Sequence, residues 1–133
     1  MKVTTIDLHM HSCHSLDGEK SVQELVDIAK ESGVDVIAIA DHNTTKAYKD
    51  EVDLKGVTII PAIELDCQFQ GKDFHILGYG IDPMHPVWDE ICESVDTMEK
   101  NSGLARLEII TKEMGIQVDM DKLKAWRPNG IYE

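Results

Sequence analysis

The chain has 133 residues, of which 42% are hydrophobic, a composition that is typical of a folded globular domain and excludes extended disorder. It carries 25 acidic and 13 basic side chains, and its formal net charge of −12 disfavours broad binding to duplex DNA. No apolar run approaches the roughly 20 residues that a membrane-spanning helix needs, so we expect no membrane association.

The first element is predicted from a β-branched run at residues 3–6, which is typical of a buried strand, and the motif at residues 7–11 follows at its exit. Alternate residues of a strand share a face, so the imidazoles of His9 and His11 should lie side by side, with Asp7 on the same face. Neutral imidazole is the commonest ligand for divalent transition metals, and a carboxylate behind it can orient the ring or bind the ion. An isolated pair of this kind is more often two surface histidines, so the interpretation depends on the residues downstream.

A helix and a second strand follow. Ser21 and Glu24 form the capping-box pattern that starts a helix, and Gly33 stands where a left-handed C-terminal cap belongs. The near-continuous apolar run at residues 34–40 predicts a strand covered on both faces, which favours a parallel sheet in a βαβ unit. We expect the helix to bury its apolar residues, Val22, Leu25, Val26, Ile28 and Ala29.

The pattern then partly repeats. A short helix is expected at residues 44–51 and a third buried strand at residues 57–61. Apolar segments at residues 65–69 and 74–79 flank Gly71, which predicts a hairpin.

Beyond Pro86 the sequence changes to a helical pattern. Helices are predicted at residues 87–101, 104–114 and 119–126, the second of them closed by Gly115.

Polar residues interrupt or follow each predicted strand. Functional groups of parallel α/β folds gather at the carboxyl ends of strands, where Asp41-His42 ends the second strand and Glu64 follows the third. His75 lies on the second strand of the hairpin. Singly, each of these residues is an ordinary loop, surface or core residue, but the ordered set favours a metal centre. The other histidines have no such pattern and are expected in solvent: His14 and His85.

The chemistry of this donor set indicates which ions it would hold. Nitrogen and oxygen ligands without cysteine suit zinc, manganese or iron. The donors outnumber what one tetrahedral ion accepts, which indicates a cluster of two or more ions.

These motifs resemble the N-terminal part of the PHP (polymerase and histidinol phosphatase) family of metal-dependent phosphoesterases. The matching segments are residues 7–11, 15–18, 40–44, 61–64 and 74–79. The resemblance covers essentially the whole chain, and the stretch after Pro86 is similar to the helical insertion of the branch that acts on nucleotides and short oligonucleotides.

The resemblance implies an α/β fold built as part of a distorted seven-stranded β/α barrel. Residues 1–80 would form the N-terminal half of the barrel with the metal-ligand motifs, and residues 81–133 an incomplete helical insertion. The family pattern also includes a further histidine and a late Asp-x-His, which this sequence lacks. We therefore expect a truncated chain with weak or no activity of its own, or a dimer or partner chain that covers the open barrel edge.

The resemblance further implies a trinuclear centre of zinc, manganese or iron, with two or three divalent ions in a complete site. His9 and His11 would bind one ion, Asp17 and His42 another, Glu64 would bridge, and His75 would bind the third. A metal-bridging hydroxide would attack the phosphorus of a small phosphorylated substrate, a nucleotide or short oligonucleotide.

Three further residues are weaker candidates. Asp41, beside His42, would assist proton transfer, with a strand-end cap as the alternative. Arg106 and Arg127 are the only arginines and would be the candidates to hold a non-reacting phosphate, although ordinary surface or helix-end arginines are the preferred interpretation.

Three other functions are compatible with the sequence. They are a non-catalytic metal-binding or interaction module, a histidinol-phosphate phosphatase, and an amidohydrolase-like hydrolase that uses the same His-x-His on a first barrel strand.

The sequence has three cysteines, an odd number, and they lack a Cys-x-x-Cys spacing, which argues against disulfides and favours a cytoplasmic protein.

Overall fold

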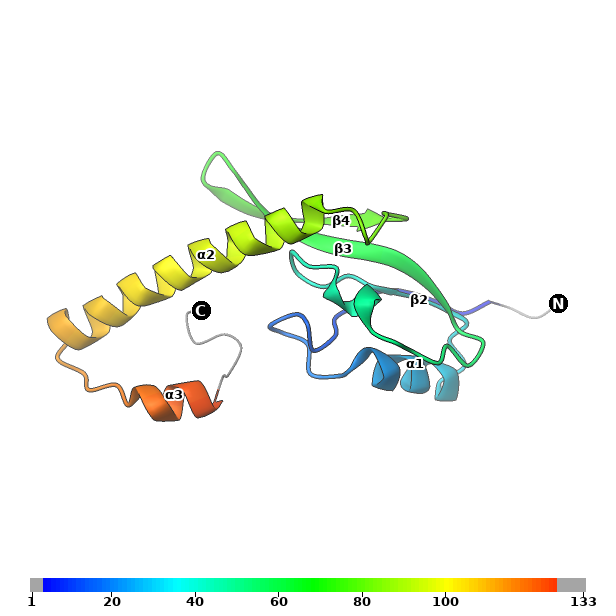
Figure 1. Cartoon of the computed structure of the whole chain (residues 1–133), viewed down its shortest axis with the longest axis horizontal. Coiled ribbons are helices and arrows are strands. Elements are labelled where there is room, and N and C mark those ends of the chain that lie inside the picture. The colour runs from blue at the N-terminus through cyan, green and yellow to red at the C-terminus, as the bar shows by residue number, and fades with distance from the viewer. Residues whose placement is uncertain (1–3, 127–133) are drawn as a thin grey trace. The chain divides into compact units, whose positions relative to one another are not determined.

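The computed structural model describes residues 4–126 (Figure 1). Its elements are β1 (Ile6–Met10), α1 (Val22–Glu31), β2 (Val36–Ile39), a 3₁₀ helix (Lys46–Lys49), β3 (Thr58–Phe69), β4 (Lys72–Tyr79), α2 (Val87–Glu108), a π-helical segment (Ile109–Glu113) and α3 (Met120–Trp126). The chain divides into two compact units between Ile91 and Cys92, inside α2, whereas the motifs place the division at residue 80.

The first unit is built on one four-stranded sheet with the order β1-β2-β3-β4. β1 pairs with β2 and β2 with β3 in parallel, and β4 adds an antiparallel strand, so the predicted α/β class with a parallel βαβ unit is confirmed. The Tyr79 hydroxyl of β4 donates a hydrogen bond to the Leu8 carbonyl of β1 at 3.0 Å. Because β1 and β4 stand at opposite ends of the strand order, this bond requires a strongly curled sheet. The curl brings side chains of all four strands toward one another.

The prediction for the first strand was wrong in position and in burial. Thr4 and Thr5 precede β1, Val3 lies outside the described residues, and the motif at residues 7–11 falls largely within the strand. Ile6 and Leu8 are exposed because β1 is an edge strand, with a neighbour only on its β2 side. A continuous apolar run therefore does not distinguish an edge strand from a central one.

Helix α1 forms as its capping signals predict. The Ser21 backbone N–H donates to Glu24 Oε2 at 2.8 Å, and the Glu24 N–H donates to Ser21 Oγ at 3.3 Å, which completes the capping box. Val26 and its helical neighbours pack on Ile37 of β2. Ile28, predicted to be buried, is about half exposed because it lies off the face that contacts the sheet.

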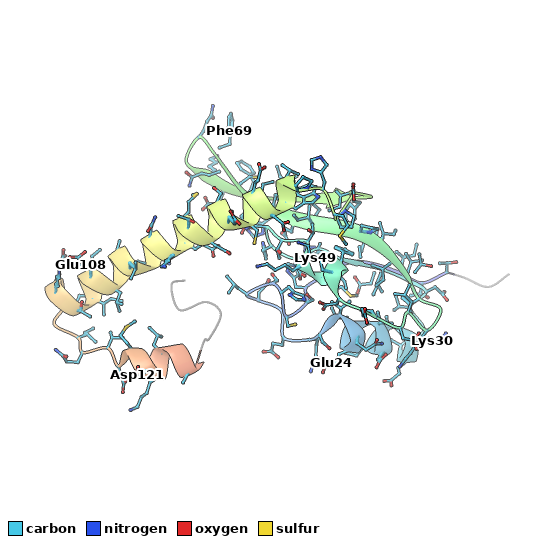
Figure 2. The ribbon with its side chains drawn as sticks, viewed as in Figure 1. Glu24, Lys30, Lys49, Phe69, Glu108 and Asp121 are labelled. Atoms are coloured by element: carbon cyan, nitrogen blue, oxygen red, sulfur yellow. The ribbon has the colours of Figure 1, made fainter. Side chains whose placement is uncertain are left out.

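Strand β3 is one continuous strand of 12 residues, so the predicted separation at Pro61 was wrong. Its first part pairs with β2, and from Ala62 onward it pairs with β4. As a consequence Glu64 lies inside a strand rather than after one. The hairpin itself is confirmed: Gln70 and Gly71 form a two-residue turn with φ of +52° and +72°. Phe69 stands beside this turn, largely exposed (Figure 2).

The proline inside β3 is tolerated because a side chain supplies the missing interaction. Pro61 has no N–H to donate to the sheet. The Tyr48 hydroxyl lies beside it, accepts a hydrogen bond from the Ala62 N–H at 2.8 Å and donates one to the Ile39 carbonyl. Burial raises the pKa of Tyr48 to about 12. The hydroxyl therefore joins β2 to β3 where the backbone cannot.

Replacing Tyr48 with phenylalanine should lower the free energy of unfolding by about 1–3 kcal/mol, because a backbone donor and acceptor lose their partner. The folded-state pKa exceeds the unfolded value near 10, so the tyrosine's stabilising contribution is complete below pH 10 and falls between pH 10 and about 12. Urea denaturation of both proteins from pH 7 to 11.5 measures this. Equal stability at pH 7, or an undiminished alkaline loss in Tyr48→Phe, contradicts the assignment.

The second unit is helical. The two helices predicted at residues 87–101 and 104–114 are one helix, α2, followed by the π-helical segment, so Gly103 lies inside a helix rather than at a break. Gly115 has a φ of +68° after the π-helical segment, as predicted. α3 is also confirmed, and the Asp119 carboxylate caps it by accepting from two backbone N–H groups. None of the helices between residues 4 and 126 is long and apolar enough to cross a membrane.

Candidate metal centre

All six predicted metal ligands come together in the first unit. They are supplied by β1, by the loops after β1 and β2, and by the adjacent strands β3 and β4. They form three overlapping groups of potential donors: His9, His11 and Glu64; His11, Asp17 and His42; His42, Glu64 and His75. Within each group the donor atoms lie within 4.8 Å of one another.

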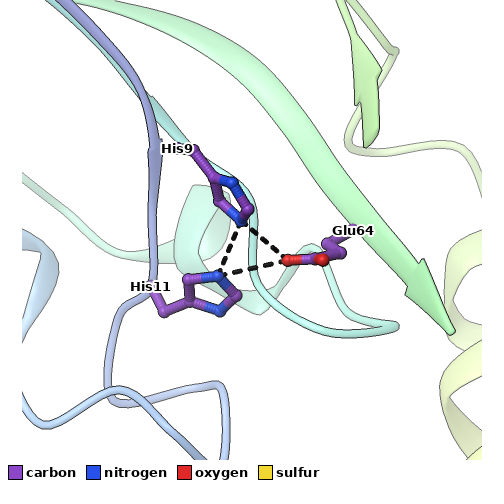
Figure 3. Close-up of side chains that lie close together, drawn as sticks. All are labelled: His9, His11 and Glu64. Carbon is purple, nitrogen blue, oxygen red and sulfur yellow. Dashed lines mark hydrogen bonds and ion pairs between the residues drawn. The ribbon is translucent and has the colours of Figure 1, made fainter. Parts of the chain in front are cut away.

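The first group joins the His-x-His pair to β3 (Figure 3). The Nε2 atoms of His9 and His11 are 3.0 Å apart, and Glu64 Oε2 lies 2.8 Å from the first and 3.2 Å from the second. A register irregularity in β1 between Asp7 and Met10 accompanies this placement. The Glu64 side chain is only 4% exposed, so its charge is balanced by these rings rather than by solvent.

The second group depends on the loop after β1. Asp17 Oδ1 is 3.1 Å from His11 Nδ1, and Asp17 Oδ2 is 3.5 Å from His42 Nε2. The buried Ser15 hydroxyl donates to Asp17 Oδ1 at 2.6 Å and accepts from the His42 backbone N–H at 3.2 Å. Ser15 therefore holds a carboxylate of one loop against the backbone of another.

The third group extends the cluster to the hairpin. His75 Nδ1 lies 2.9 Å from Glu64 Oε1, the oxygen that the first group does not use, and His42 Nε2 lies 3.7 Å from Oε2. The Glu64 N–H donates to the Asp41 carbonyl, and the Asn43 N–H donates to the Glu64 carbonyl. These two bonds fix the loop after β2 on β3, with Glu64 at the centre of the cluster.

Both carboxylates of the cluster are held ionised. Burial alone would raise the pKa of Glu64, but the hydrogen bond to His9 and the positive charge of the neighbouring imidazoles outweigh it and lower the pKa. For Asp17 burial is likewise outweighed, here by the Ser15 hydrogen bond and the charges of His11 and His42. Anionic carboxylates among imidazoles are what a divalent ion requires.

The donor spacing fits a divalent ion. An ion about 2.1 Å from each of its donors holds them roughly 3.0–3.4 Å apart in tetrahedral or octahedral geometry. The three donor atoms of the His9, His11 and Glu64 group are 2.8–3.2 Å apart. The buried carboxylate and the two rings thus have the separation of ligands around one centre.

None of the three donor groups found among the described residues includes a weaker candidate. Asp41 is fully buried and accepts from the Ser12 N–H at 2.6 Å and the Ser12 hydroxyl at 2.7 Å, and burial raises its pKa. Its carboxylate anchors the loop after β1. This contact corresponds to the strand-end cap, the alternative to proton transfer. Asp7 contacts the backbone N–H of His9 rather than a ring. Arg106 is exposed on α2, and Arg127 lies outside the described residues.

Sequence reasoning missed Asp66 as a partner of the cluster. Asp66 Oδ1 lies 2.7 Å from His42 Nδ1, and the two-residue alternation with Glu64 in β3 was a signal that could have found it. His14, expected in solvent, is paired with Asp50 at 3.0 Å because the loop after β1 folds back on the chain. His85 is exposed, as predicted.

A family model described as the PHP domain matches residues 7–126. The chain is 36% identical over 102 residues to a 5'-3' exoribonuclease of Haemophilus influenzae, a match that covers 74% of this chain and 36% of the relative. It is 30% identical over 121 residues to a phosphoribosyl 1,2-cyclic phosphate 1,2-diphosphodiesterase of Eggerthella lenta, covering 87% of this chain and 45% of the relative.

The fold matches as well. The solved structure of an amidohydrolase from Chromobacterium violaceum, with bound sulfate and no metal, superposes with a TM-score of 0.76 at 24% identity. That match covers 97% of this chain and 46% of the other, so the chain spans less than half the length of each of these three proteins. The partial PHP barrel predicted from the motifs is confirmed. By its family model and by these relatives, the chain belongs to the PHP domain family.

Proposed function

We propose that this protein hydrolyses phosphate esters of small nucleotides or short oligonucleotides with the help of divalent ions. The observation that carries the proposal is the position of Glu64, whose two carboxylate oxygens face His9 and His11 on one side and His75 on the other. A buried carboxylate shared in this way is suited to bridge neighbouring ions. The relatives named as an exoribonuclease and a cyclic-phosphate diesterase support phosphate ester chemistry.

The residues that would hold the ions are the three donor groups described above. His9, His11 and Glu64 would hold one ion, and Asp17 and His42 a second, with His75 directed toward a third. The nitrogen and oxygen donor set suits zinc, manganese or iron. Bound ions would stabilise negative charge on the phosphoryl oxygens and lower the pKa of a water molecule.

Side chains of the protein would keep the ligands ionised and hold the surrounding loop in place. The lowered pKa values of Asp17 and Glu64 keep both carboxylates ionised at neutral pH, so they need not lose a proton before an ion binds. Asp41 would support the site through Ser12 and the loop after β1. A role for Arg106 in holding a non-reacting phosphate stays a prediction, as does a second chain covering the exposed edge strand β1.

A hydrolysis assay tests the proposal. The substrates are an adenosine 3',5'-bisphosphate, a short 5'-phosphorylated RNA and histidinol phosphate, each with manganese or zinc. We expect slow, metal-dependent hydrolysis of the first two, abolished by a chelator and by Glu64→Gln. Hydrolysis of histidinol phosphate alone, or activity that survives both the chelator and the substitution, contradicts it.

A non-catalytic metal-binding module is the second candidate. The three donor groups by themselves support metal binding, whether or not hydrolysis follows. Metal binding without hydrolysis of any of the three substrates would support this second candidate over the first.

A further inference from the structure

Asp66 stands behind the metal-facing histidines, on the side away from Glu64. Its Oδ1 lies 2.7 Å from Nδ1 of His42 and 3.5 Å from Nε2 of His75. The opposite ring nitrogens face Glu64: His42 Nε2 lies 3.7 Å from Oε2, and His75 Nδ1 lies 2.9 Å from Oε1. Both rings are therefore placed between two carboxylates that come from alternate positions of β3.

The short contact to Asp66 determines which nitrogen of the His42 ring carries the hydrogen. A carboxylate only accepts hydrogen bonds, so in neutral His42 the hydrogen resides on Nδ1. The lone pair is then on Nε2, which faces Asp17 Oδ2 at 3.5 Å and Glu64. A ligating histidine commonly passes its other N–H to a carboxylate in this way, which fixes the ring and makes it a better donor.

Asn43 holds the Asp66 carboxylate in place. The Asn43 Nδ2 donates to Asp66 Oδ2 at 2.7 Å, and the Asp66 backbone N–H donates to Asn43 Oδ1 at 2.9 Å. Asn43 has a φ of +56°, a left-handed conformation that asparagine tolerates better than most residues. This reciprocal pair prevents rotation of Asp66 and ties the His42 loop to β3.

We propose that Asp66 is a positioning residue that fixes the tautomer and ring orientation of His42, with Asn43 locking its carboxylate. The proposal rests on the proposed role of His42 as a metal ligand, because only then does the direction of Nε2 matter for function. It gives Asp66 no contact with the ion. The competing interpretations are an exposed acid without a role and a further direct ligand.

The test uses Asp66→Ala and Asp66→Asn, with Asp73→Asn as the matched control. Asp73 is an exposed acid of the same hairpin whose carboxylate accepts from Gln68, so this variant changes the charge equally but leaves His42 untouched. The nitrogen chemical shifts of His42, recorded without metal at pH 8, report the tautomer directly. We expect the Nδ1–H form in the wild-type chain and in Asp73→Asn, and its loss in Asp66→Ala.

Calorimetric titration with zinc supplies the second readout. We expect Asp66→Ala to bind zinc about 10–100 times more weakly with unchanged stoichiometry, and Asp73→Asn to bind as the wild type does. An unchanged tautomer in Asp66→Ala overturns the inference, and so does the loss of one ion from the stoichiometry, which would make Asp66 a ligand. If Asp66→Ala does not fold, the zinc affinity of the isosteric Asp66→Asn decides, because its amide oxygen is a weaker acceptor for the His42 N–H than a carboxylate; an affinity equal to that of the wild type overturns the inference. A wild-type chain that binds no zinc refutes the proposed function, while the tautomer measurement still decides the orienting role.

Discussion

Glu64→Gln should abolish most of the stabilisation that manganese or zinc gives this chain. Glu64 contacts His9, His11 and His75 through both of its oxygens, and an amide offers one weaker acceptor and an N–H₂ group in place of the second. An ion at about 100 times its dissociation constant stabilises the folded state by roughly 2.7 kcal/mol, and that increment should largely vanish. Thermal unfolding with and without the ion measures it.

The matched control for this substitution is Glu51→Gln, an exposed glutamate of the same unit outside the donor groups. It should keep the full ion-dependent increase in Tm. If Glu64→Gln responds to the ion as strongly as Glu51→Gln does, Glu64 is not at the centre of a metal site.

Gly18→Ala should cost more stability than any other glycine-to-alanine change in the described part of the first unit. A Cβ at residue 18 would lie 1.9 Å from the Ser12 carbonyl oxygen and 2.5 Å from its carbon, so the backbone itself would have to move. Ser12 is buried, and it binds Asp41 through its N–H and its hydroxyl. We expect a loss of about 3 kcal/mol or more, together with weaker metal binding, because Asp17 belongs to the displaced loop.

Gly33→Ala separates this clash from the general cost of replacing a glycine. Gly33 has a φ of +73° but open space around its Cα, so alanine there should cost about 1–2 kcal/mol from backbone strain alone. Metal binding should not change, since Gly33 follows α1 and contacts no donor residue. Urea denaturation and zinc titration of both variants make the comparison. Equal losses of stability in the two variants would show that the loop at Gly18 adapts to the extra methyl group.

The sequence predicts those parts of the fold that local patterns determine. The capping box at Ser21, the turn at Gly71 and the parallel pairing of the second and third strands all follow from short stretches of sequence. The continuity of β3 through Pro61 was not predicted, because the hydroxyl that compensates for the missing proline N–H belongs to Tyr48, 13 positions earlier in the chain. No local pattern reports a hydrogen bond of that separation.

In the candidate site, too, local motifs identify some residues, whereas others can be recognised only from the tertiary structure. Ordered motifs at strand ends identified six side chains, and the curled sheet brings all six together. Asp66 and Ser15 were not identified as partners, because each acts on a histidine from another element. In the same way the sequence does not reveal that the Asp41 carboxylate accepts hydrogen bonds from Ser12, 29 positions earlier. Donor types can be read from a sequence, whereas their supporting contacts depend on tertiary structure.

We expect this cluster to hold more than one divalent ion, and a direct count of bound ions tests that expectation. The chain is equilibrated with zinc or manganese, freed of unbound ions by dialysis, and analysed for metal per mole of protein, with Glu64→Gln in parallel. We expect two or more ions per chain in the wild type and a clear loss in the variant. One ion or none in the wild-type chain, or equal occupancy in both proteins, would contradict it.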